Sequence, residues 1–161
     1  MSEIPNRGRI LALDVGGKRI GVAMSDPDRI IASGQQTLDA QPTKTVFMRI
    51  KHIVEQEEIT QIVIGLPLTL RGEVGPQAEI VQTFGRELAK RVAVPIALYD
   101  ERLTSVAAER SLEAMGVKKS KRRDHVDELA AILILQAYMD SLRSAKAWAE
   151  REAQNGEEVR G

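Results

Sequence analysis

The segment from Arg9 to Asp26 constrains the fold more than any other part of the chain. It contains two short apolar runs, residues 10–13 and 20–23, which are joined by a turn with two adjacent glycines. Both runs are too short and too β-branched for helices, so they predict the two strands of a hairpin. The glycines suit a tight turn or a close backbone approach. An aspartate, Asp14, stands where the first strand meets this turn.

Asp14 needs a positive partner, because an ionised carboxylate on an apolar strand is costly to bury alone. Lys18 and Arg19 follow in the same turn, and a metal ion is the other candidate. The hairpin by itself leaves two readings open. Asp14 either takes part in metal or phosphate chemistry or stabilises the glycine turn.

The rest of the chain alternates between predicted strands and helices. Residues 30–38, 61–65 and 95–99 have the pattern of strands, whereas residues 43–54, 75–91, 104–115 and 124–142 have the apolar spacing of helices. Right-handed crossovers then give an α/β protein with one five-stranded mixed sheet, ordered 3-2-1-4-5 and flanked by helices. We expect one domain over residues 1–143 and a polar tail over residues 144–161, which is either a frayed helical end or disordered.

Composition limits the class of protein. Lys plus Arg equals Asp plus Glu at 23 each, so any attraction to nucleic acid must come from a local patch. The absence of cysteine excludes disulfides and thiolate metal sites. The longest apolar run, residues 129–135, is too short for a membrane span, and the N-terminus lacks the pattern of a signal peptide. We therefore expect a cytoplasmic protein.

Acidic residues fall where the predicted strands end. Asp14 closes the first strand and Glu101 follows the last, and ligands of open α/β sheets bind at the carboxyl ends of parallel strands. Asp127 lies on the last predicted helix, with apolar residues at helical spacing on the same face: Ala130, Ala131, Ile134 and Tyr138. We expect that face to pack on the sheet, which would bring Asp127 to the same edge.

Three converging carboxylates favour divalent metal ions. Carboxylates at neighbouring strand ends repel one another unless a cation lies between them, and oxygen ligands without cysteine favour Mg²⁺ or Mn²⁺. Such a triad can hold two ions about 3.5–4 Å apart and hydrolyse phosphodiesters without a protein nucleophile. Structural roles are the alternative: Asp14 in the turn, Glu101 paired with Arg102 or with the following helix end, and Asp127 at a helix N-terminus. His125 is a candidate for assisting proton transfer near Asp127.

A local basic patch precedes the last helix. Five cations without an acid lie between Met115 and Asp124, and four further cations lie near the predicted strand ends. All nine cations are candidates for contacts to phosphates. The alternative interpretation of the five-residue patch is a solvated linker. The candidates are Lys18, Arg19, Arg71, Arg102, Lys118, Lys119, Lys121, Arg122 and Arg123.

Four segments carry a resemblance to a known family. Residues 13–23 (LDVGGKRIGVA), 63–68 (VIGLPL), 100–105 (DERLTS) and 126–136 (VDELAAILILQ) together resemble the YqgF family of bacterial RNase H-like nucleases, from about Arg9 to Leu142. The resemblance implies an RNase H-like fold, with Asp14, Glu101 and Asp127 matching the acidic triad. It also implies a nuclease that trims the 5′ end of the 16S rRNA precursor, although many members are described as Holliday junction resolvases.

The partners implied by this resemblance are nucleic acids, either precursor rRNA or branched DNA, together with ribosomal particles. Sequence leaves open whether the protein is a monomer or a homodimer. Two other classes also remain open. An acid followed by glycines in a hairpin resembles the phosphate-binding turn of actin-like and Hsp70-like ATPases, although those proteins use two such domains. A non-catalytic ribosome-binding or nucleic-acid-binding module on the same fold is the third class.

Overall fold

The computed structural model describes residues 5–104 and 122–160, the last with backbone only for 122–128 and 157–160. Its strands are β1 (Arg9–Val15), β2 (Arg19–Ser25), β3 (Ala32–Asp39), β4 (Ile59–Leu66) and β5 (Ile96–Asp100). Its helices are α1 (Thr43–Gln56), α2 (Pro76–Ala89), the 3-10 turn η1 (Glu101–Leu103) and α4 (Arg122–Arg160). The predicted helix over residues 104–115 falls, after Thr104, outside the described residues.

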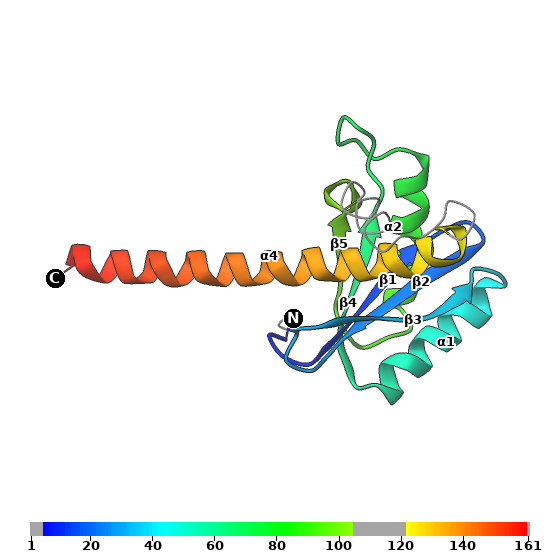
Figure 1. Ribbon diagram of the computed structural model, residues 1–161, viewed down its shortest axis with the longest axis horizontal. Helices are drawn as coiled ribbons and strands as arrows, with labels where there is room; N and C mark the ends of the chain where they lie inside the picture. Colours follow the sequence, from blue (N-terminus) through cyan, green and yellow to red (C-terminus); the bar gives the residue numbers. More distant parts are fainter. Residues whose placement is uncertain (1–4, 105–121, 161) are drawn as a thin grey trace.

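The five strands form one mixed sheet in the order β3-β2-β1-β4-β5, as predicted (Figure 1). β1 pairs antiparallel with β2, with Asp14 opposite Gly21, and β1 pairs parallel with β4, with Leu13 opposite Ile64. β5 continues the parallel half beyond β4, with Gly65 opposite Tyr99. The carboxyl ends of β1, β4 and β5 therefore lie along one edge of the sheet.

Two apolar cores cover the two faces of the sheet. Along β1, Leu11 and Leu13 belong to the core beneath α1 and α2, whereas Ile10 and Ala12 belong to the core beneath α4. All four side chains are fully buried, which explains why β1 has a continuous apolar run instead of a polar alternation. The described elements thus form three layers, with α1 and α2 on one face of the sheet and α4 on the other.

α4 is longer than the sequence pattern predicts. The apolar face ends near Leu142, yet the helix continues to Arg160 and projects beyond the sheet (Figure 1). Of the two alternatives for the tail, the helical one is present. Residues 143–153 are rich in alanine, glutamate, lysine and arginine, which favour helix without any packing partner. The domain limit at residue 143 stays a prediction.

Within the parts of the chain that are described, no helix is long and apolar enough to cross a membrane.

One buried polar contact fastens α4 to the middle of the sheet. The side-chain amide of Gln61 on β4 donates a hydrogen bond to the hydroxyl of Tyr138 on α4. Gln61 is fully buried and Tyr138 is only 8% exposed. A buried amide that loses its partner costs more free energy than the hydrogen bond itself contributes.

α4 also approaches the sheet closely over Gly65. A methyl group built on Gly65 would lie 2.5 Å from Cδ1 of Ile134, which is fully buried. A side chain at position 65 would therefore force the side chain of Ile134 to move out of this contact. Gly17, in the hairpin turn, has no atom within 4 Å of the corresponding position.

The Gln61 contact predicts the effect of removing the tyrosine hydroxyl. Tyr138→Phe should lower the free energy of unfolding by about 1–3 kcal/mol, because the Gln61 amide would lose its partner in a dry core. Chemical denaturation measures this loss. In a Gln61→Met background the same substitution should cost much less, and an equal cost in both backgrounds would contradict the coupling.

The contact over Gly65 predicts different effects for two glycine substitutions. Gly65→Ala should destabilise the fold by about 1–3 kcal/mol, because the added methyl overpacks the contact with Ile134. Gly17→Ala adds the same methyl at an open surface position and should change stability by less than about 0.5 kcal/mol. The denaturation midpoints of the two variants measure this difference. Equal midpoints would show that the contact between α4 and the sheet adjusts to the added methyl group without loss of stability.

Candidate active site

The candidate site lies at the carboxyl ends of β1, β4 and β5, on the side of the sheet covered by α4. Side chains at every second position of a strand share a face, so Asp14 follows Ile10 and Ala12 onto the α4 side. Because Leu13 pairs with Ile64, Asp14 stands beside Gly65 at the end of β4. Asp14 is partly buried and makes interactions of its own.

Glu101 reaches the same place from β5. Its Oε2 would lie 3.5 Å from a methyl group on Gly65, the same group that would meet Ile134. Gly65 therefore separates the strand that ends in Asp14 from the segment that carries Glu101. The missing side chain leaves room for both carboxylates beneath α4.

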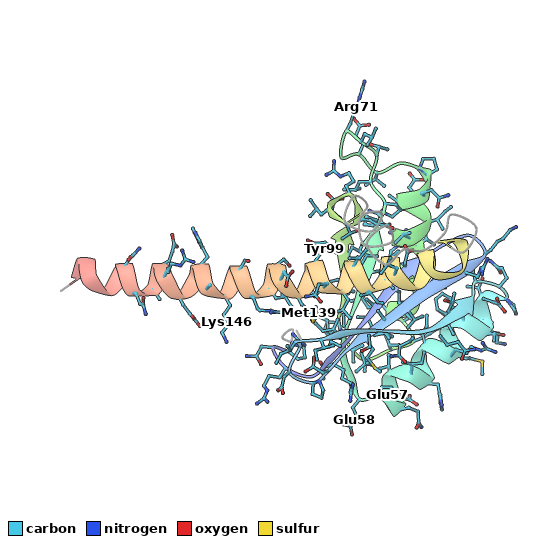
Figure 2. The ribbon with its side chains drawn as sticks, viewed as in Figure 1. Glu57, Glu58, Arg71, Tyr99, Met139 and Lys146 are labelled. Atoms are coloured by element: carbon cyan, nitrogen blue, oxygen red, sulfur yellow. The ribbon has the colours of Figure 1, made fainter. Side chains whose placement is uncertain are left out.

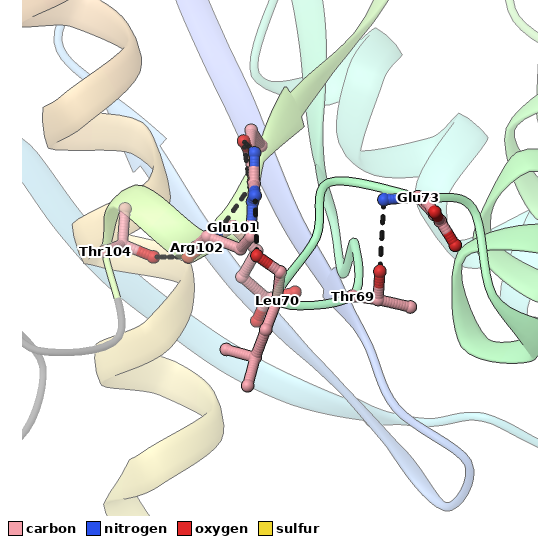
Figure 3. Close-up of polar contacts among 7 residues, drawn as sticks. Thr69, Leu70, Glu73, Glu101, Arg102 and Thr104 are labelled. Carbon is pink, nitrogen blue, oxygen red and sulfur yellow. Dashed lines mark hydrogen bonds and ion pairs between the residues drawn. The ribbon is translucent and has the colours of Figure 1, made fainter.

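The backbone of Glu101 is fixed by a short 3-10 turn. The backbone N–H and the hydroxyl of Thr104 both donate to the carbonyl of Glu101, at 3.0 and 2.9 Å, and Thr104 is buried (Figure 3). At the start of the turn, the carboxylate of Asp100 accepts the backbone N–H of Arg102 at 3.0 Å. Both ends of the turn are therefore capped, which limits the positions that Glu101 can take.

Arg102 pairs with Asp100 and not with Glu101, which corrects one of the two structural alternatives considered for Glu101. The other, a pairing with the following helix end, falls outside the described residues. Its guanidinium donates to both oxygens of Asp100, at 2.7 Å for the shortest bond. Hydrogen bonds from Arg102 hold the pKa of Asp100 below its ordinary value, and the pKa of Arg102 is raised in turn. Within the described part of the chain, the carboxylate of Glu101 has no ion pair.

Arg102 also fastens the loop between β4 and α2. One of its guanidinium nitrogens lies 3.5 Å from the carbonyl of Leu70, and the group lies against Gly72, whose φ is +80° (Figure 3). Thr69 closes the loop with hydrogen bonds to the backbone of Glu73. Sequence reasoning did not identify these contacts. It expected Arg102 to bind phosphate, whereas much of its hydrogen-bonding capacity is used here.

Other predicted phosphate contacts are exposed around this edge. Arg71 lies at the outer tip of the loop (Figure 2), and Lys18 and Arg19 lie in the β1–β2 hairpin. The carbonyl of Arg19 accepts the N–H of Gly16 at 3.0 Å, and a methyl group on Gly16 would lie 2.7 Å from that oxygen. The first glycine of the turn is thus required sterically, whereas Gly17 is not.

α4 carries Asp127 in its N-terminal part, for which only the backbone is described. Of the four residues that the helical spacing predicted to face the sheet, Ala131, Ile134 and Tyr138 are buried, whereas Ala130 is half-buried. Arg122, Arg123 and His125 lie in the same stretch of backbone, and Lys118, Lys119 and Lys121 fall outside the described residues. The roles of all seven polar residues stay predictions.

The residues present fit a divalent ion. Two carboxylates from distant parts of the sequence share one face beside a glycine, and their mutual repulsion favours a cation between them. The described side chains, which do not include that of Asp127, contain no group of three possible metal ligands. The donor set is oxygen only, which suits Mg²⁺ or Mn²⁺.

Comparisons with known proteins show close relatives over most of the chain. A protein provisionally named pre-16S rRNA nuclease from Roseiflexus sp. (strain RS-1) is 48% identical, covering 84% of this chain and 96% of the relative. One of the same name from Streptomyces avermitilis is 46% identical, covering 88% of this chain and 92% of the relative. These relatives confirm the resemblance seen in the four sequence segments.

Two solved structures share the fold. RuvC of T. thermophilus, in complex with a Holliday junction substrate, aligns with a TM-score of 0.52 at 16% identity, covering 82% of this chain and 96% of RuvC. The fowlpox virus Holliday junction resolvase aligns with a TM-score of 0.50 at 13% identity, covering 83% of this chain and 99% of the resolvase. The RNase H-like fold that the sequence implied is thereby confirmed.

A family model described as "RuvX: Holliday junction resolvase" matches residues 8–141, which include every described element of the sheet and the buried part of α4. The chain belongs to the RuvX family.

Proposed function

We propose that this protein is a metal-dependent nuclease that hydrolyses phosphodiester bonds, acting in the cytoplasm on the 5′ end of the 16S rRNA precursor. One observation carries the proposal. Asp14 and Glu101 lie on either side of Gly65, on the face of the sheet that packs against the helix carrying Asp127. Relatives named as pre-16S rRNA nucleases, 48% identical to this chain, support the choice of RNA substrate. Ribosomal particles would then be its partners.

Asp14, Glu101 and Asp127 would hold one or two Mg²⁺ or Mn²⁺ ions. When bound, such ions activate water and stabilise the leaving oxygen of a phosphodiester. The pairing of Arg102 with Asp100 supports this role for Glu101, because it keeps the neighbouring guanidinium from neutralising the carboxylate. The capped turn at residues 101–103 would hold Glu101 in place, so little reorganisation would be needed.

The exposed cations would position the substrate. Lys18, Arg19 and Arg71 surround the strand ends and would contact phosphates on either side of the cleaved bond. The basic segment from Lys118 to Arg123 would add contacts before α4. Arg102 would act mainly as a positioning residue for the loop at residues 67–75.

Branched DNA is the second candidate substrate. It is favoured by the description of the family model, which names a Holliday junction resolvase. Cleavage of a precursor rRNA and of a four-way DNA junction, compared at equal enzyme and ion concentrations, separates the two. Faster cleavage of the junction would reverse our choice of substrate without changing the chemistry.

The carboxylates predict a dependence on metal and on Asp14. Activity should disappear in chelator and return with Mg²⁺ or Mn²⁺, and Asp14→Asn should lower the cleavage rate by at least about 100-fold, since it removes a charged ligand. Nucleic-acid binding by the variant, measured by fluorescence anisotropy, should persist. Asp26→Asn, at the β2–β3 turn, is the matched control, and cleavage that survives chelation would refute the mechanism.

The basic segment predicts a separate loss of binding. Replacing Lys118, Lys119, Lys121, Arg122 and Arg123 by glutamine should weaken substrate affinity and flatten its salt dependence, by about 0.7–0.9 in slope for each lost phosphate contact. The maximal cleavage rate should largely survive, because the transition-state charge is met elsewhere. An unchanged salt slope would show that the segment is only a solvated linker.

A further inference from the structure

A groove between α1 and α2 lies on the side of the sheet opposite α4. Its upper part, about 380 Å³, is lined by the hairpin turn and by both helices. Its lower part, about 700 Å³, continues between the same two helices. Thr43, Phe47 and Glu87 line both parts, so the two form one continuous surface.

The groove begins at the edge that holds the candidate active site. Val15, Gly16 and Gly17 form its upper wall and directly follow Asp14 in the chain. The start of α1 is tied to this turn, because the N–H of Ala40 donates to the carbonyl of Lys18 at 2.8 Å. A polymer bound at the acidic residues could therefore pass over the glycine turn into the groove.

The lower part of the groove is strongly cationic. Of its eight lining residues, four are basic and only Glu87 is acidic: Thr43, Lys44, Phe47, Met48, Lys51, Glu87, Lys90 and Arg91. Glu87 is already paired, with Lys90 at 3.0 Å and Arg91 at 3.4 Å. Lys44 and Lys51 are exposed and have no ion pair among the described residues. The whole chain is neutral, so this excess of positive charge is local.

The geometry of the groove favours contact with a phosphate backbone over contact with bases. Lys44 and Lys51 are seven residues apart on one face of α1, which places them about 10 Å apart along the helix. Phe47, the aromatic floor, is only 4% exposed and is covered by the guanidinium of Arg91 at 4.5 Å. It cannot offer a ring for base stacking, which leaves cations as the binding groups.

We propose that the α1–α2 groove binds the phosphodiester backbone of the substrate at a distance from the bond that is cut. This inference rests on the proposed nuclease function and extends it, because it gives the substrate a second, sequence-independent contact surface. Lys44, Lys51, Lys90 and Arg91 bind phosphates, and the apolar stems of the lysines cover the helix walls. The protein then prefers long substrates to short ones.

The test is the double variant Lys44→Gln/Lys51→Gln, since neither lysine holds another part of the fold. The control is Arg49→Gln/Arg86→Gln, which removes the same charge from exposed positions of the same two helices but outside the groove lining. Binding of single-stranded RNA in a series of increasing lengths is measured by anisotropy, in chelator and at several salt concentrations. Cleavage of the same RNAs is measured separately with Mg²⁺.

For long RNA, the plot of log affinity against log salt should be less steep for the groove variant by about 1.4, because two phosphate contacts of about 0.7 each are lost. If the two proteins bind equally at 1 M salt, the variant should bind about 25-fold more weakly at 0.1 M salt. The affinity for short RNA, which reaches only the acidic edge, should not change. The maximal cleavage rate should not change either. The control should bind like the parent protein.

Equal slopes for the groove variant and the parent on long RNA would overturn the inference and leave an acidic protein segment as the occupant to consider. Binding is measured without metal, so it is independent of cleavage. If the groove variant changes the salt slope but the parent protein cleaves no RNA, the nuclease function is refuted and the inference about the groove still holds.

Discussion

The close contact of α4 with the sheet over Gly65 is the constraint on which the site depends. Because position 65 has no side chain, Ile134 can reach the sheet and the carboxylate of Glu101 can lie beside the strand that ends in Asp14. The buried bond between Gln61 and Tyr138 fixes the same helix one turn further along. Packing and site geometry are therefore set by the same few contacts, and a change that moves α4 also moves Asp127.

Charge around the site is distributed between neighbouring acids with different partners. Asp100 takes the guanidinium of Arg102, whereas Glu101, the next residue, has no ion pair among the described residues. Under the proposed function, the first of these two adjacent carboxylates would have a structural role and the second a chemical one. The pair formed by Asp100 lies on the surface, where an ion pair contributes little to stability, so its main effect is to orient the loop and to leave Glu101 available.

Much of the fold follows from pattern, because strand alternation and right-handed crossovers admit few arrangements. The sheet order and the positions of Asp14 and Glu101 at the strand ends followed from that argument alone. What pattern could not show depends on contacts between distant residues. The sequence does not reveal that Arg102 pairs with Asp100 and not with Glu101. Nor does it reveal that a methyl group at position 65 would meet Ile134, whereas one at position 17 would meet nothing. Whether α4 continues past Leu142 was left open between a helical end and a disordered tail, because an exposed helix has no apolar face to detect.

The two surfaces of the sheet would serve one substrate in different ways. The α4 side gathers acids, which repel a polyanion unless cations are present, while the α1–α2 side gathers free lysines that attract it. A chain with no net charge can bind a polyanion only through such separation. Binding at the basic groove would raise the local concentration of phosphodiester near Asp14 and Glu101 without neutralising either carboxylate. The carboxylate of Glu101, which has no ion pair among the described residues, then remains available to a metal ion, which a basic residue paired with it would displace.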